Sequence, residues 1–182
     1  MIKFLEPIVS ALWLHNHLKA DDLVILDGTI NKVIDTSQFQ IPNARLFDIK
    51  NTLAPFPSTC PSQEQFQKEA RALGIYNDSA IVVYDDKGIY SSARVWWLFK
   101  AFGYENVAVL NGGFPEWKKA GFATESMKLY SGKSGNFEAN YKSGLFTFFN
   151  DVKKASKSKS HAIIDVRTKN RFKSLEPEPR VG

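Results

Sequence analysis

Short apolar runs alternate with helical patterns along the chain, and this alternation restricts the possible folds more than any other feature. The runs LVILD at 23–27, AIVVYD at 80–85 and VAVL at 107–110 have the length and the β-branched residues of buried strands. AIVVYD leads through a short loop into SSARVWWLFKAFG, in which apolar residues recur at helical spacing. Strands that alternate with helices build a parallel sheet covered by helices. The sequence therefore predicts an α/β fold with a parallel sheet flanked by helices on both faces.

Weaker patterns predict further elements of the same fold. An amphipathic stretch at 8–18 is expected to be a helix, and ARLFD at 44–48 is a possible additional strand. Ser62 and Gln65 form a capping box, which predicts a helix that starts there and ends near 73–74.

An internal repetition predicts a second domain. AIIDVRT, within a predicted strand at 161–166, is similar to LVILDGT in the first strand, and such a recurrence indicates a duplicated domain. Residues 1–122 are expected to form the first domain, the polar stretch 123–160 a linker, and 161–182 the start of an incomplete second copy. One strand cannot bury a core. We therefore expect a truncated chain whose last residues lie against the first domain or are mobile.

Composition excludes several classes of protein. The only cysteine, Cys60, cannot form an internal disulfide or a cysteine-based zinc site, so we expect no metal, no other cofactor and a reducing cytoplasmic location. Glu6 and Pro7 interrupt the apolar N-terminal stretch, which argues against a signal peptide. No run of apolar residues is long enough to span a bilayer. The net charge of +5 is concentrated at 153–159, a patch without aromatic residues, which indicates a solvated face rather than binding to nucleic acid or a membrane.

The loop after the strand at 80–85 is the predicted functional site. In open parallel sheets, ligands bind at the carboxyl ends of the strands. Backbone N–H groups and a helix N-terminus meet at such a loop, which suits an anion, a thiolate or a persulfide. The candidate loop residues are Asp85, Asp86, Lys87, Gly88, Ile89 and Tyr90.

The motifs around this loop resemble a known family. IVVYDDKGIYSSARVWWLFKAFGYENVAVLNGGFPEW is similar to the first domain of the rhodanese and mercaptopyruvate sulfurtransferase family, and DVRTKNRFKSLEPEPRVG resembles the segment that enters its second domain. The resemblance covers nearly the whole chain. It implies a rhodanese-like fold and transfer of a sulfane sulfur from thiosulfate or 3-mercaptopyruvate to a thiol or cyanide. A cysteine persulfide in the second domain carries the sulfur.

The resemblance also implies roles for individual residues. Asp85 stands where the second domain has its thiol, and a hard carboxylate oxygen should cap the loop or helix rather than replace sulfur. The chain alone is therefore expected to be inactive. Arg171 and Arg180 match arginines that bind the carboxylate of the donor. Lys50, where the mercaptopyruvate branch has an acidic residue, leaves the choice of donor open.

Other conspicuous residues have simpler interpretations. Cys60 has no basic neighbour in sequence and is expected to be an ordinary loop cysteine. Trp96 and Trp97 are expected to pack in the core. The three histidines, His15, His17 and His161, are expected to be surface or hydrogen-bonded residues, and Gly112 and Gly113 to be turn residues.

Two alternative functions remain open. The chain could be a non-catalytic rhodanese-like module whose Asp85 loop binds an anion or a partner. VVYDDKG could also be the nucleophile loop of an aspartate phosphatase, but Lys87 occupies the place where that chemistry needs a second carboxylate.

Overall fold

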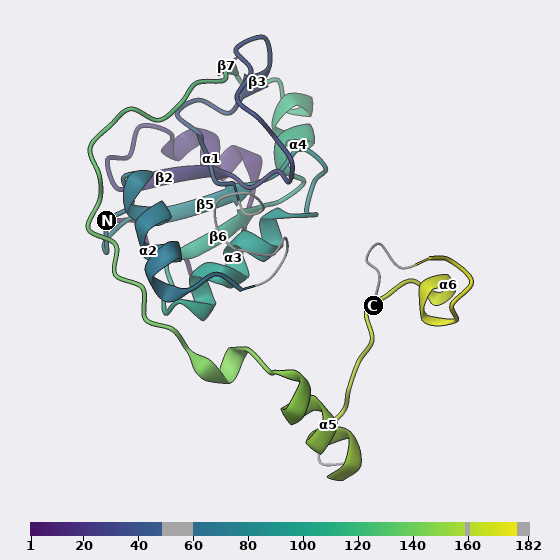
Figure 1. Ribbon diagram of the computed structural model, residues 1–182. Coiled ribbons are helices and arrows are strands. Elements are labelled where there is room, and N and C mark those ends of the chain that lie inside the picture. The colour runs from purple at the N-terminus through teal and green to yellow at the C-terminus, as the bar shows by residue number, and fades with distance from the viewer. Residues whose placement is uncertain (49–59, 159–160, 178–182) are drawn as a thin grey trace. The chain divides into compact units, whose positions relative to one another are not determined.

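Five parallel strands form the central sheet, in the order β1-β6-β5-β2-β4 (Figure 1). The computed structural model describes residues 1–48, 60–158 and 161–177. The chain divides into two units, a first unit from Met1 to Lys142 and a second unit from Ser143 to Gly182. The strands of the central sheet are β1 (Ile8–Val9), β2 (Leu23–Asp27), β4 (Arg45–Leu46), β5 (Ala80–Tyr84) and β6 (Val107–Leu110). All three strongly predicted strands are therefore confirmed, and they are neighbours at the centre of the sheet.

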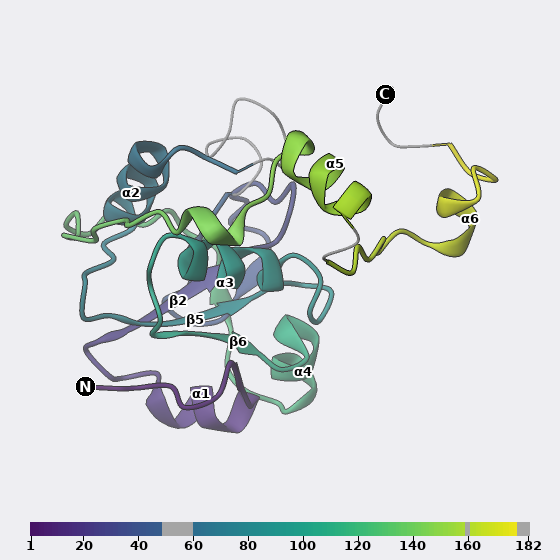
Figure 2. The same ribbon diagram turned by 90° about the horizontal axis from the view of Figure 1, so that it is seen from below.

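Helices cover both faces of the sheet, as predicted. Figure 2 shows one pair of helices on each face: α1 and α4 lie on one, and α2 and α3 on the other. These helices are α1 (Ala11–His17), α2 (Gln63–Ala72), α3 (Ser92–Ala101) and α4 (Gly113–Lys119). The first unit thus has the three-layer arrangement that alternating strands and helices produce.

Two apolar cores hold the layers together. Under α1 and α4, Leu14 and Trp117 pack with Ile25 and Tyr84 of the sheet. On the other face, aromatic rings form the core, and Phe66 is stacked on Phe102 with ring centroids 4.3 Å apart. Both cores are fully buried, so the sheet between them carries almost uninterrupted apolar sequence, as a parallel sheet requires.

Side-chain caps begin two of the helices in the first unit. The Ser62 hydroxyl accepts a hydrogen bond from the Gln65 backbone N–H at 3.1 Å, which confirms the predicted start of α2. Ser10 caps α1 in the same way, through the Trp13 N–H at 3.0 Å. These bonds satisfy N–H groups that have no partner inside a helix.

The start of the chain differs from the prediction. Ile8 does not begin a helix but lies in β1, an edge strand that pairs with β6, and the helix begins only at Ala11. Leu12 points outward and is exposed. A two-residue strand is too short to show a period, so the sequence pattern merged it with the helix that follows.

Residues 123–142 belong to the first unit rather than connecting two units. Within them, β7 (Glu125–Ser126) pairs antiparallel with β3 (Phe39–Gln40), and Met127 and Phe137 are buried. Phe137 joins the aromatic core through edge contacts with Phe66 and Phe99. Residues 123–142 are polar on average, but the few apolar residues among them pack into the first unit.

The second unit contains only helical elements among its described residues. They are the 3-10 helix η1 (Ser143–Leu145) and the helices α5 (Phe149–Ser158) and α6 (Lys169–Phe172). The predicted strand at 161–166 is wrong, because residues 162–166 form no strand and Ile164 and Val166 are exposed. A strand needs a neighbour for its backbone hydrogen bonds. Whether this unit begins a second rhodanese-like domain stays a prediction.

None of the helices in the described ranges combines the length and the apolar character that crossing a lipid bilayer would require.

Candidate functional site

Asp85 follows β5 directly at the carboxyl end of the central strand, and its side chain is buried with 1% exposed. The carboxylate accepts hydrogen bonds from the loop that it begins. Oδ1 accepts from the Lys87 N–H at 2.9 Å. Oδ2 accepts from the N–H groups of Tyr90, Ser91 and Ser92 at 2.8, 3.0 and 2.9 Å, and from the Ser92 hydroxyl at 2.6 Å. The loop therefore closes around a single negative charge.

The same carboxylate caps α3. Ser91 is the N-cap residue of this helix but its side chain makes no capping hydrogen bond, and Asp85 from the preceding strand binds the N–H groups at that end instead. Burial raises the pKa of Asp85, but the hydrogen bonds from Ser92, Tyr90 and Lys87 outweigh it, and the pKa lies below its ordinary value. Asp85 is thus an ionised cap of loop and helix, as the resemblance implied.

The NGG turn after β6 presses against this loop. Gly112 and Gly113 have φ values of +70° and +54°, which other residues rarely adopt. A Cβ on Gly113 would collide with the carbonyl oxygens of Asp85 and Gly88, and the Phe114 N–H donates to the Asp85 carbonyl at 2.9 Å. Gly112 is a turn residue, as expected, whereas Gly113 is already the first residue of α4 and permits the close approach of this helix start to the Asp85 loop.

The remaining loop residues face outward. Asp86, Lys87, Ile89 and Tyr90 are exposed, and the Lys87 ammonium lies 5.0 Å from the centre of the Tyr90 ring. The loop thus presents an aromatic side chain and a cation around the buried carboxylate. Neither the loop nor its cap contains a thiol.

A second charged cluster at this edge of the sheet was missed by sequence reasoning. Asp27, at the end of β2, is fully buried and accepts a hydrogen bond from the Lys32 ammonium at 2.7 Å. Lys32 also lies 3.5 Å from Asp86, with 6% of its side chain exposed. The Asp86 N–H donates to the Thr29 hydroxyl at 3.1 Å, so the ends of β2 and β5 are joined.

The missed cluster had one signal in the sequence. Asp27 ends its apolar run as Asp85 ends the next, and in the sheet Asp27 pairs in register with Tyr84. Tyr84 is buried, and its hydroxyl has no hydrogen-bond partner within the described ranges. Burial first, and then the negative charge of Asp27, raises the pKa of Tyr84 well above its ordinary value. Lys32 could not have been assigned, because only the folded chain brings it to Asp27.

Cys60 has the properties of an inert thiol. It is half-buried, and its Sγ donates to the Pro61 carbonyl oxygen at 3.3 Å. Burial raises the pKa of Cys60, and the opposing charge of Arg94 does not reverse this. A reactive cysteine needs a lowered pKa, so the interpretation of an ordinary loop cysteine is supported.

The predicted donor-binding arginines are not brought together by the described structure. Arg171 lies in α6, where its backbone N–H donates to the capping Thr168 hydroxyl at 3.3 Å. Arg180 and Lys50 fall outside the described residues. Carboxylate binding by Arg171 and Arg180 stays a prediction.

The histidines and tryptophans have structural partners. His17 Nδ1 lies 2.7 Å from the Trp13 carbonyl oxygen, and the His15 ring stacks on Phe122 at 4.1 Å. The indole N–H of Trp96 donates to the Val107 carbonyl at 3.0 Å. In the described part of the chain, no three His, Cys, Asp or Glu residues gather as a metal site would require.

The geometry argues against the phosphatase alternative. A nucleophilic carboxylate must present an oxygen to its substrate. Both oxygens of Asp85 accept hydrogen bonds from the loop, and the side chain is buried.

Comparisons with known proteins agree with this architecture. Residues 10–120 match the family described as rhodanese-like domain. Thiosulfate/3-mercaptopyruvate sulfurtransferase 1, mitochondrial, of Arabidopsis thaliana is 36% identical over an alignment covering 97% of this chain and 55% of that protein. Human 3-mercaptopyruvate sulfurtransferase is 32% identical, with 97% and 65% covered. The crystal structure of SseA from Escherichia coli, described as a rhodanese fold, has a TM-score of 0.84 at 29% identity and covers 96% of this chain and 70% of that one. The chain thus spans between 55% and 65% of these two curated relatives.

Replacing Asp85 with Asn should destabilise the first unit in a pH-dependent way. Because the pKa of Asp85 is lowered by folding, its contribution is present above the unfolded pKa of about 3.9 and is lost as the pH falls through the lower folded value. We expect Asp85→Asn to lower the free energy of unfolding by about 2–4 kcal/mol at neutral pH, with a smaller difference below about pH 4. Urea unfolding between about pH 2.5 and pH 7 measures this. Asp78→Asn, at an exposed site, is the control, and equal curves for both variants would contradict the cap.

Replacing Gly113 with Ala should cost more than the same change at Gly121. Both glycines have positive φ, so alanine strains the backbone at each site by about 1–2 kcal/mol. At Gly121 an added Cβ meets open space, whereas at Gly113 it meets the backbone of the Asp85 loop. We expect Gly113→Ala to lower the free energy of unfolding by about 1–3 kcal/mol more than Gly121→Ala. Chemical denaturation of both variants tests this, and equal losses would show that the close approach is unimportant.

Proposed function

The chain belongs to the rhodanese-like domain family, and from this premise we propose that it is the first-domain part of a sulfurtransferase. The enzyme moves a sulfane sulfur from thiosulfate or 3-mercaptopyruvate to a thiol or cyanide acceptor. In this proposal residues 1–122 hold the central sheet of a non-catalytic rhodanese-like domain, and residues 123–160 connect it to the second domain, although 123–142 still pack within the first unit. Residues 161–182 begin the second, catalytic domain. That second rhodanese domain is the partner that the proposal requires.

The closed loop around Asp85 is the observation that carries the proposal. Three consecutive backbone N–H groups and a hydroxyl converge on one anionic oxygen at the mouth of a parallel sheet. A loop of this kind built around a cysteine would lower the pKa of the thiol and hold a thiolate or persulfide. In this domain a carboxylate takes that position, so the loop has the architecture of the catalytic loop without its nucleophile.

The transfer proceeds in two balanced steps. A thiolate attacks the outer sulfur of thiosulfate or the thiol sulfur of 3-mercaptopyruvate and forms a sulfur–sulfur bond. The sulfur–sulfur bond of thiosulfate or the carbon–sulfur bond of 3-mercaptopyruvate breaks, and the electron pair leaves with sulfite or with an enolate that is protonated to pyruvate. The acceptor thiolate or cyanide then attacks the outer sulfur of the persulfide, and the cysteine thiolate is regenerated. No step uses a metal or another cofactor. A reducing compartment such as the cytoplasm suits this chemistry, because it keeps the acceptor thiols reduced.

The exposed side chains of the same loop favour one alternative. Ile89 and Tyr90 are exposed next to Lys87, as they would be in a module that binds a partner or an anion without catalysis. This alternative needs no second domain, and the activity of a two-domain polypeptide, measured in the last experiment below, distinguishes it from the enzyme.

The 182-residue chain should not transfer sulfur by itself. Its only thiol, Cys60, has a raised pKa and lies outside the Asp85 loop. We expect no thiocyanate from thiosulfate and cyanide, no pyruvate from 3-mercaptopyruvate, and no added sulfur atom on Cys60 by mass spectrometry. Cys60→Ser is the matched control. Turnover above the background without protein would overturn the assignment of a non-catalytic domain, whether or not it survives Cys60→Ser.

Replacing Arg171 with Met should affect the KM for 3-mercaptopyruvate more than the KM for thiosulfate. We expect the KM for 3-mercaptopyruvate to rise by about tenfold or more, because the guanidinium loses its two-point contact with the carboxylate. The KM for thiosulfate, which has no carboxylate, should change by less than about threefold. The measurement uses a two-domain polypeptide that contains this chain, with Lys173→Met as the control. An equal effect on both donors would remove Arg171 from carboxylate recognition, and the absence of activity with either donor would favour the binding module.

A further inference from the structure

A hollow of about 590 Å³ lies within the first unit and involves neither the Asp85 loop nor the second unit. Three segments line it: residues 18–25 from the end of α1 into β2, residues 43–45 at the start of β4, and residues 128–132 after β7. Leu23 and Arg45 belong to the amino-terminal parts of their strands, whereas Asp85 follows the carboxyl end of β5. The sulfur-transfer proposal therefore does not account for this hollow.

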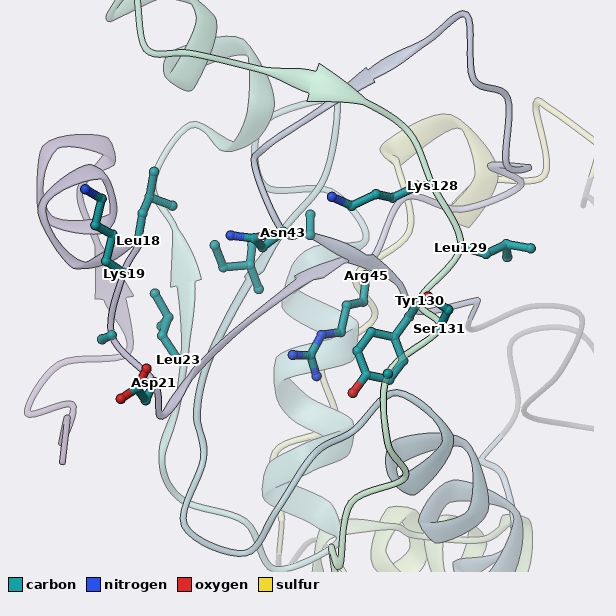
Figure 3. A pocket seen from close by; sticks show the side chains of 14 residues that line it. Leu18, Lys19, Asp21, Leu23, Asn43, Arg45, Lys128, Leu129, Tyr130 and Ser131 are labelled. Carbon is teal, nitrogen blue, oxygen red and sulfur yellow. The ribbon is translucent and has the colours of Figure 1, made fainter.

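Arg45 is the central polar group of the hollow and is held in place on one side (Figure 3). Its Nη1 donates to the carbonyl oxygens of Leu73 and Gly74, the latter at 3.2 Å. The guanidinium carbon lies 4.3 Å from the centre of the Tyr130 ring. In the described part of the chain no carboxylate pairs with Arg45. The donors at Nε and Nη2 are therefore left for a ligand, and Figure 3 shows the group directed toward the space between Leu23 and Tyr130.

Tyr130 is itself fixed by its surroundings. Its hydroxyl donates to the Lys133 carbonyl at 2.9 Å. A Cβ on either Gly74 or Gly132 would collide with this hydroxyl in its present position. Arg45 is thus held by two carbonyl oxygens and lies on a ring whose hydroxyl is hydrogen-bonded, and a preorganised cation loses little entropy when it binds an anion.

The electrostatics of the hollow also favour an anion. Burial lowers the pKa of Arg45 from its ordinary value, which means that the guanidinium has given up hydration without an acidic partner. Lys19 and Lys128 add positive charge at the lining, and the Lys128 ammonium is already 2.9 Å from Glu125. The single acidic lining residue in the described structure is Asp21.

The apolar part of the lining indicates the rest of the ligand. Leu18 and Leu23, which are partly buried, contribute apolar side chains to the lining beside Arg45, and the buried Ile25 and Ala44 lie next to them. Inorganic phosphate would leave this surface uncovered, and the volume lies within the range of sites for small organic molecules, about 300–1,000 Å³.

We propose that this hollow is a binding site for a small organic anion, whose carboxylate or phosphate is held by the Nε and Nη2 edge of Arg45 while its apolar body lies on Leu18 and Leu23. The site is independent of the sulfur chemistry, and its test uses no activity assay.

Binding of matched aromatic probes tests the site. Benzoate and phenyl phosphate carry an oxyanion on an apolar ring, benzamide has the same ring without charge, and inorganic phosphate has the charge without the ring. At constant ionic strength, we expect benzoate or phenyl phosphate to shift the backbone amide NMR signals of residues 18–25, 43–45 and 128–132. Benzamide and inorganic phosphate should each bind at least about fivefold more weakly. Equal binding of benzamide would overturn the role of Arg45, and equal binding of inorganic phosphate would overturn the organic class of ligand.

Variants of Arg45 complete the test. Arg45→Met should weaken binding of the anionic probe by about tenfold or more, and Arg45→Lys, which keeps the charge but not the fork, by about threefold to tenfold. Lys119→Met, at an exposed residue outside the lining, should leave binding unchanged. If Arg45→Met does not fold, the affinities of Arg45→Lys and Lys19→Met for the anionic probe are compared with that of the unchanged chain instead. Unchanged affinity in the folded Arg45 variants, or signal shifts confined to other residues, would overturn the proposal.

Discussion

The hydrogen bonds that close the loop around the Asp85 carboxylate are the constraint on which the edge of the sheet depends. This one side chain ends β5, holds the loop, and caps α3 in place of its own N-cap residue. Because the loop is drawn inward, its carbonyl oxygens lie where the NGG turn meets them, and only glycine fits at 113. A buried charge is tolerated because every part of it is paired, and the pairing in turn orders three consecutive backbone groups.

Under the proposed function, the same constraint explains how a rhodanese-like domain can retain its architecture without a catalytic nucleophile. The converging N–H groups of such a loop need a negative charge to accept their hydrogen bonds, and the ionised Asp85 supplies one permanently. A cysteine in that position would supply it only as a thiolate, so a catalytic loop accepts a less stable resting state in return for a reactive group. In the proposed first domain the loop does not need a reactive group, so Asp85 can stabilise it permanently.

The elements that were predictable from sequence are those whose signals are local. β2, β5 and β6 are uninterrupted apolar runs, Ser62 caps its helix through a contact three residues away, and Asp85 could be placed because it follows a central strand directly. The features that escaped prediction depend on residues far apart in sequence. Lys32 reaches Asp27 and Asp86 only when two strands lie side by side, and Arg45 meets Tyr130 only because residues 123–142 return to the first unit. That return relies on a few buried side chains, such as Phe137, within a polar stretch in which no period can be detected.

The error at 161–166 shows what an apolar run does and does not encode. AIIDV has the composition of a buried strand, yet Ile163, Ile164 and Val166 are exposed and no residue in the described part of the second unit is buried. The run carries a propensity, but a strand exists only when a neighbour accepts its hydrogen bonds and covers its side chains. A unit with an amphipathic helix, an apolar run and no core of its own gains stability only from further packing surface. Under the proposed function, residues 161–182 would gain that surface from the remainder of a second rhodanese domain, and we expect residues 162–166 to become a strand there.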